Sequence, residues 1–270
     1  MQCLGYFSYL LLIVMSFECM QHLALVANWS NYLLQSFVFA TVMTISSFLM
    51  CWFIFYSIKT PTSSVKINLA LMLSALLNMG KALLAIGFGA ALYFTPLSNS
   101  MSFIDSWYLL LIFMVFIGID SQGIGIKRGW LNIKILLLPL SAILGSMLAA
   151  IGLYYLTQPE MNLWSLLALS QGHGFYSMSG IIMTKMVSPE LGTFALMIDL
   201  FRELIAILML YAIGWRYPRS SICAAGATSM DATLPMIKQS CGSDFIPYAL
   251  MSGLILTLIA PIMVSVLAAI

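Results

Sequence analysis

The sequence predicts an all-α polytopic membrane protein with about seven transmembrane helices and two further segments that are broken, re-entrant helices. The first observation is composition: 62% of the residues are hydrophobic and 7% are charged, whereas soluble domains have about 45–50% and about 25%. The second is a series of long apolar runs, because about 20 apolar residues span a bilayer. The third is that glycines, serines and charges interrupt two of these runs. We therefore expect a single transmembrane domain over residues 1–270.

Seven runs are apolar enough to be spans. The first, residues 4–15, is short, but it has neither the preceding cation nor the cleavage site of a signal peptide, so we expect a helix. The other six cover residues 32–58, 67–94, 107–119, 135–156, 191–215 and 245–270.

Loop cations predict the orientation, because cytoplasmic loops are enriched in Lys and Arg. If every apolar run crossed the bilayer, the last two loop cations, Arg216 and Arg219, would lie outside. They return to the cytoplasmic side if residues 164–187 enter and leave from one face. Residues 220–238 then form a second hairpin from the cytoplasmic face, the two hairpins meet near the middle, and the N-terminus is cytoplasmic while the C-terminus is outside. The loop cations are Lys59, Lys66, Lys127, Arg128, Arg216 and Arg219.

The second hairpin carries the motif AAGATSMDATLPMIK at residues 224–238. It puts Asp231 at membrane depth, where a charge is rarely kept without a partner or a water-lined cavity. Thr228 or Ser229 can cap a new half-helix, and Pro235 is tolerated in its first turn. Secondary transporters bind substrate at such broken helices. The alternative is an ordinary span whose charge reaches the interface.

Further polar groups are candidates for a substrate or ion site. Residues 170–180, SQGHGFYSMSG, contain Ser177 and Ser179. We expect these two hydroxyls, with those of the second break, to bind substrate; the alternative is that they only satisfy the broken backbone. Asp120 is flanked by glycines and is expected to be a second acid, as a proton relay or as the partner of a second amine.

Three charges occupy one apolar run: Asp199, Arg202 and Glu203. Residues three or four apart share a helical face, so Arg202 can pair locally. We expect a mostly structural cluster in which Arg202 is shared between the two acids.

Other features limit the function. Five cysteines without a CxxC pair and only two histidines predict no disulfide framework, no metal site and no cofactor. No basic tract predicts nucleic-acid binding. His173 and Ser177 are four residues apart but lack a recognisable oxyanion loop, so we do not expect an enzyme.

An internal repeat is also predicted. Residues 9–13 and 108–112 both read YLLLI, and Trp29 and Trp130 follow at nearly the same distance. Three spans separate the copies, so we expect inverted repeats around residues 4–94 and 107–200.

Three ordered strings, GHGFYSMSGIIMTK, IDLFRELIAILML and CAAGATSMDATLPMIKQSCG, resemble the C-terminal motifs of the bacterial LysO-type lysine exporters. The resemblance implies a multi-pass protein of the bacterial cytoplasmic (inner) membrane that exports L-lysine and toxic lysine analogues. It also implies intramembrane acids important for transport, with Asp231 matched by motif. This chain differs in having His173 where the family carries Phe, and it is expected to lack the family's first helix.

These observations together predict proton antiport. Lysine leaves as a cation against an inside-negative potential, at about 2.3 kcal/mol per charge per 100 mV, so export needs a coupled ion. The expected partners are L-lysine, protons and the lipid bilayer, and Asp231 is expected to bind lysine and a proton by turns. The alternatives are a carboxylate-based antiporter for another amine or amino acid, and a membrane subunit inactive in transport.

Overall fold

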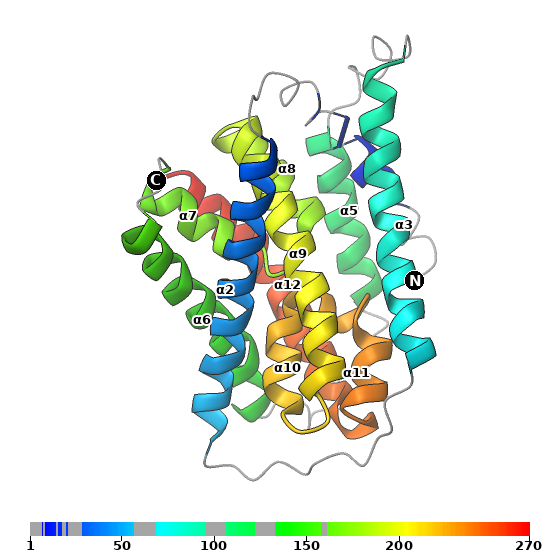
Figure 1. The fold of residues 1–270 in the computed structure, drawn as a ribbon, viewed down its shortest axis with the longest axis vertical. Coiled ribbons are helices and arrows are strands. Elements are labelled where there is room, and N and C mark those ends of the chain that lie inside the picture. Colours follow the sequence, from blue (N-terminus) through cyan, green and yellow to red (C-terminus); the bar gives the residue numbers. More distant parts are fainter. Residues whose placement is uncertain are drawn as a thin grey trace.

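The computed structural model describes residues 7, 9–14, 16, 17, 20, 29–56, 69–95, 106–121, 133–157 and 161–270, and every regular element among them is a helix (Figure 1). The longer helices are α2 (Trp29–Phe55), α3 (Leu69–Tyr93), α5 (Ser106–Ser121), α6 (Ile133–Thr157), α9 (Pro189–Ile213) and α12 (Ile246–Ala268). The short ones are α7 (Leu163–Ser170), α8 (Tyr176–Met186), α10 (Pro218–Ala225), η2 (Gly226–Met230), α11 (Leu234–Ser240) and η3 (Ser243–Phe245).

By length and composition, three helical stretches in the described part are apolar enough to cross a membrane: Asn31–Phe55, Ile133–Thr157 and Ser243–Ala268. The six later predicted spans coincide with the six longer helices to within a few residues. Several residues of the first predicted span lie outside the described part. Much of the first predicted repeat copy, residues 4–94, is also outside it, so that repeat stays a prediction.

Helices α2, α6 and α9 form the frame of the fold. Tyr32 and Phe48 of α2 contact Phe194 and Tyr217 around α9, with ring centroids 5.3 and 6.2 Å apart, so α2 and α9 run in the same direction. Helix α6 crosses α2 closely at Gly145, where a Cβ would lie 2.7 Å from the Cα of Ser47. Small residues allow such close backbone approach between membrane helices.

The two interrupted segments are hairpins at opposite ends of this frame, called the upper and lower ends after Figure 1. The end of α8 packs on the beginning of α9, where a Cβ on Gly192 would collide with Thr184. Helix α11 returns to the end of α9, where the Tyr211 hydroxyl donates to the side-chain oxygen of Gln239 at 3.3 Å. The α7–α8 hairpin therefore enters from the upper end and the α10–α11 hairpin from the lower end.

Cap residues explain where two of these helices begin. Asn162 accepts a hydrogen bond from the Ser165 amide at 2.6 Å at the start of α7. Ser188 accepts from the Leu191 amide at 3.2 Å at the start of α9, and Pro189 occupies the first turn, where its missing N–H costs nothing.

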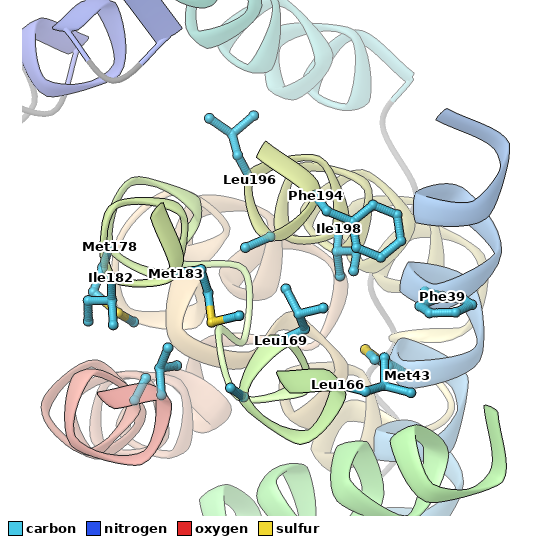
Figure 2. Close-up of a cluster of buried hydrophobic side chains, with 14 of the residues drawn as sticks. Phe39, Met43, Leu166, Leu169, Met178, Ile182, Met183, Phe194, Leu196 and Ile198 are labelled. Carbon is cyan, nitrogen blue, oxygen red and sulfur yellow. The ribbon is translucent and has the colours of Figure 1, made fainter. Parts of the chain in front are cut away.

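The largest apolar cluster joins the upper hairpin to the frame (Figure 2). Met43 of α2, Leu166 and Leu169 of α7, and Met178 of α8 have no exposed surface. Burial of one such side chain contributes about 1.5–3 kcal/mol. The upper hairpin is therefore held to α2 and α9 by packing, while its turn is free to be polar.

Candidate functional site

A tight turn at residues 171–175 separates α7 from α8. His173 and Gly174 both have positive φ, 51° and 84°, and such a φ is uncommon for a residue other than glycine. Asp199 of α9 holds this turn: its Oδ1 accepts from the Gly174 amide at 2.9 Å and its Oδ2 from the Ser179 hydroxyl at 2.5 Å. The Asp199 carboxylate therefore lies at the start of α8, where a helix N-terminus favours negative charge.

Arg202 is buried against the same turn. Its guanidinium donates to the Ser170 carbonyl at 2.7 Å and contacts Nδ1 of His173 at 3.3 Å. Because a guanidinium has no acceptor, Nδ1 must accept, so Nε2 carries the ring proton and donates to the Gln171 amide oxygen at 3.2 Å. Within the described residues the hydrogen bonds of Arg202 all go to this turn. No hydrogen bond joins Arg202 to either acid of α9 among the described residues, although Arg202 lies within electrostatic range of Asp199. The expected sharing of Arg202 between the two acids therefore stays a prediction.

The second break is the short 3₁₀ helix η2. Gly226 ends α10 with φ 64° and ψ −132°, a conformation that favours glycine. The Thr228 hydroxyl donates to the Ala225 carbonyl at 2.8 Å. The single Ser229 hydroxyl proton is shared between the Gly226 carbonyl at 2.7 Å and the Ala249 carbonyl at 2.9 Å. The hydroxyls of η2 thus satisfy the interrupted backbone and tie η2 to α12.

Helix α11 resumes the chain after η2. The residue before it is Thr233, which makes no side-chain cap, and Pro235 lies in the first turn as predicted. The predicted cap at Thr228 or Ser229 is wrong, because both hydroxyls close the 3₁₀ turns that precede the half-helix.

The two breaks contact each other through their backbones. The Ala227 amide donates to the His173 carbonyl at 3.0 Å, and a Cβ on Gly226 would lie 2.5 Å from that carbonyl oxygen. A Cβ on Gly174 would lie 3.2 Å from Cγ2 of Thr228. The predicted meeting of the two interrupted segments is therefore present, and each break supplies a partner for a backbone group of the other.

Two acids lie beside this crossing. Asp231 follows η2 and is exposed, and its carboxylate accepts from the adjacent Ala232 amide at 2.5 Å. Glu203 of α9 is 6% exposed, and it lies within electrostatic range of Asp231 and Asp199. Within the described residues the Glu203 carboxylate accepts no hydrogen bond and makes no ion pair. Two carboxylates that repel each other are stabilised by a cation between them.

The other predicted site residues have different surroundings. Ser177 and Ser179 are buried in α8, but the Ser179 hydroxyl proton is used by Asp199. The Asp199 carboxylate thus occupies the start of α8. Asp120 belongs to α5, and its side chain lies outside the described part. The roles of these residues in binding stay predictions. Among the described residues no group of three metal ligands is found.

Sequence reasoning did not place Glu203 within electrostatic range of Asp231. It placed Glu203 in a structural cluster with its neighbour Arg202 because they are adjacent. Consecutive helical residues point about 100° apart, since the helix has 3.6 residues per turn. Because of this rotation, the side chain of Glu203 lies within electrostatic range of Asp231, whereas that of Arg202 contacts the turn after α7.

Interrupted helices that enter from opposite ends and meet beside acidic side chains are the arrangement of helical membrane transporters. The sequence model of the family described as "Lysine exporter LysO" matches residues 81–268. The chain belongs to this family of membrane lysine exporters, which confirms the resemblance noted in the sequence.

Two relatives illustrate the similarity. The "Lysine exporter LysO" of Escherichia coli strain K12 is 33% identical over 157 residues, which is 58% of this chain and 52% of that protein. The "Putative lysine exporter" of Haemophilus influenzae is 31% identical over 162 residues, 58% of this chain and 80% of that protein. The chain thus spans about half the length of the E. coli protein. No solved structure matches it.

Proposed function

We propose that this protein exports L-lysine and toxic lysine analogues across the bacterial cytoplasmic membrane as a secondary transporter that exchanges them for protons. Family membership supports the substrate class. The observation that carries the mechanism is the pair of acids, Glu203 and Asp231, which lie in electrostatic range of each other beside the crossing of two broken segments.

The membrane arrangement we propose has seven spans and two re-entrant hairpins. Among the described cations near helix ends, most lie at the lower end: Lys134 begins α6, Arg216 and Arg219 flank the start of α10, and Lys238 ends α11, whereas Lys185 ends α8 at the upper end. The positive-inside rule then favours the lower end as the cytoplasmic one. Helix α12 ends on the opposite, external side.

The acid pair suits a cationic amine. An unpaired buried carboxylate such as that of Glu203 is costly, so Glu203, with Asp231 nearby, gains most from a ligand that brings N–H donors and positive charge. Lysine supplies two amines that can bind the two acids. A proton can instead bind one of the acids and remove its charge. The oxygen atoms of Thr228 and Ser229 keep lone pairs that can accept from an ammonium.

Exchange follows from competition at this site. Asp231, with Glu203 beside it, takes lysine when the site is open to the cytoplasm. A proton displaces lysine when the site is open outside, and the protonated site then returns. Because each cation binds more weakly where the other is bound, their movements are linked. Asp120 is proposed to be a second acid on the proton route.

Labelled-lysine uptake into inverted membrane vesicles tests this proposal. We expect accumulation when the vesicle lumen is acidified, and loss of accumulation in Asp231→Asn and in Glu203→Gln at unchanged protein amount. Asp244→Asn is the matched control, because Asp244 is an exposed acid of η3 outside the crossing. Lysine uptake that ignores the proton gradient, or persists in Asp231→Asn, contradicts the mechanism. Proton-driven uptake of another amine in place of lysine, or of neither, favours the alternative functions instead.

A further inference from the structure

The two hairpins and the helices that follow them form two units of equal layout. Helices α7 and α10 have eight residues each, and α9 and α12 have 25 and 23. The first helix spans positions 163–170 in one unit and 218–225 in the other, and the long helix ends at 213 in one and at 268 in the other. The same number of residues separates each of these positions in the first unit from its counterpart in the second unit. Since one hairpin enters from the upper end and the other from the lower end (Figure 1), the units have opposite orientation.

That same spacing makes Tyr176 the counterpart of Asp231. Tyr176 is the first residue of α8, directly after the first break, and Asp231 directly follows η2 in the second break. The breaks are in backbone contact between His173 and Ala227 at 3.0 Å. The two side chains therefore leave the crossing from equivalent points of the two units.

The surroundings of Tyr176 agree with this placement. Its side chain is partly exposed and packs against the small cluster of Leu12 and Ala85, as does Tyr9 of the N-terminal part of the chain. Its phenol lies within electrostatic range of both Glu203 and Asp231. Within the described residues the Tyr176 hydroxyl makes no hydrogen bond, so its oxygen is available to a ligand.

We propose that Tyr176 binds the substrate directly and completes the amine site with Glu203 and Asp231. This inference rests on the proposed function. The phenol oxygen accepts a hydrogen bond from a primary ammonium, and its proton is donated to one of the carboxylates. The ring face adds a cation–π contact with the same ammonium. The site thereby recognises a primary amine by one neutral acceptor and two acids.

Two substitutions at Tyr176 test this role in the inverted vesicles. Tyr176→Phe keeps the ring and removes the hydroxyl, and we expect it to raise the half-saturating lysine concentration about tenfold with little change in maximal rate, because a hydrogen bond to a charged group is lost. Tyr176→Leu also removes the ring face and should raise it further. Tyr211→Phe is the matched control, because its hydroxyl contacts Gln239 away from the acid pair.

The outcomes separate this inference from the proposed function. Suppose that Asp231→Asn is inactive but both Tyr176 variants keep the wild-type half-saturating lysine concentration. This result overturns the role of Tyr176 and leaves the exporter mechanism unchanged. Wild-type transport by Asp231→Asn overturns the proposed function itself. If Tyr176→Leu reduces the amount of protein, the Tyr176→Phe variant alone decides. A fall in the maximal rate of Tyr176→Phe without a change in its half-saturating lysine concentration assigns Tyr176 a structural role.

Discussion

Gly172→Ala tests whether Asp199 organises the first break. A Cβ on Gly172 would collide with the Asp199 carboxylate, which is fully buried and cannot move aside without losing its partners. Those partners are the Gly174 amide at 2.9 Å and the Ser179 hydroxyl at 2.5 Å. Hydrogen bonds to a charged group contribute about 1.5–3 kcal/mol each, so losing both should lower the free energy of unfolding by about 3 kcal/mol or more.

The assay is thermal unfolding of the purified protein in detergent, followed by the loss of monodisperse protein on heating. Gly152→Ala is the matched control: Gly152 lies in α6 with open space around its Cβ position, so alanine should be neutral or stabilise by up to about 1 kcal/mol. If Gly172→Ala unfolds at the same temperature as Gly152→Ala, the Asp199 carboxylate does not hold the turn as described.

Three further substitutions have distinct expected results. Arg202→Ala should lower the amount of folded protein, since a buried charge left uncompensated costs about 3–5 kcal/mol; normal abundance with selective loss of lysine flux would move Arg202 into the site. Gly226→Ala should destabilise by about 1–3 kcal/mol in thermal unfolding because of its positive φ, while Gly87→Ala, with open space around it, should not. Ser229→Ala should cost about 1 kcal/mol in the same assay by opening η2; unchanged stability with a raised half-saturating lysine concentration would show that its hydroxyl serves the substrate instead.

The architecture was largely predictable because hydropathy and glycine act locally. An uncharged run such as that of α12 has one stable solution in a bilayer, a helix that satisfies its own backbone. The interruption near Gly226 was predictable because glycine, hydroxyl residues and proline together break a helix. Loop cations placed the two hairpins on opposite sides, and the hairpins begin at opposite ends of the frame.

The site was less predictable because it depends on which partner a side chain finds in space. A sequence shows that Asp199 and Arg202 can meet on one face, but not that the turn after α7 supplies a backbone amide to one and a ring nitrogen to the other. Thr228 shows the same limit. Its hydroxyl was expected at a helix start, and it closes a 3₁₀ turn by donating to the Ala225 carbonyl.

The contact between Ala227 and His173 has a consequence for how such a protein can diversify. It joins an amide to a carbonyl, so its strength does not depend on which side chains stand at these positions. The contact between the hairpins is thereby separate from the side chains proposed to bind the solute. Descendants of this chain can alter the chemistry at positions 176, 203 and 231, and so adopt a different solute, without rebuilding the mechanical linkage between the two halves.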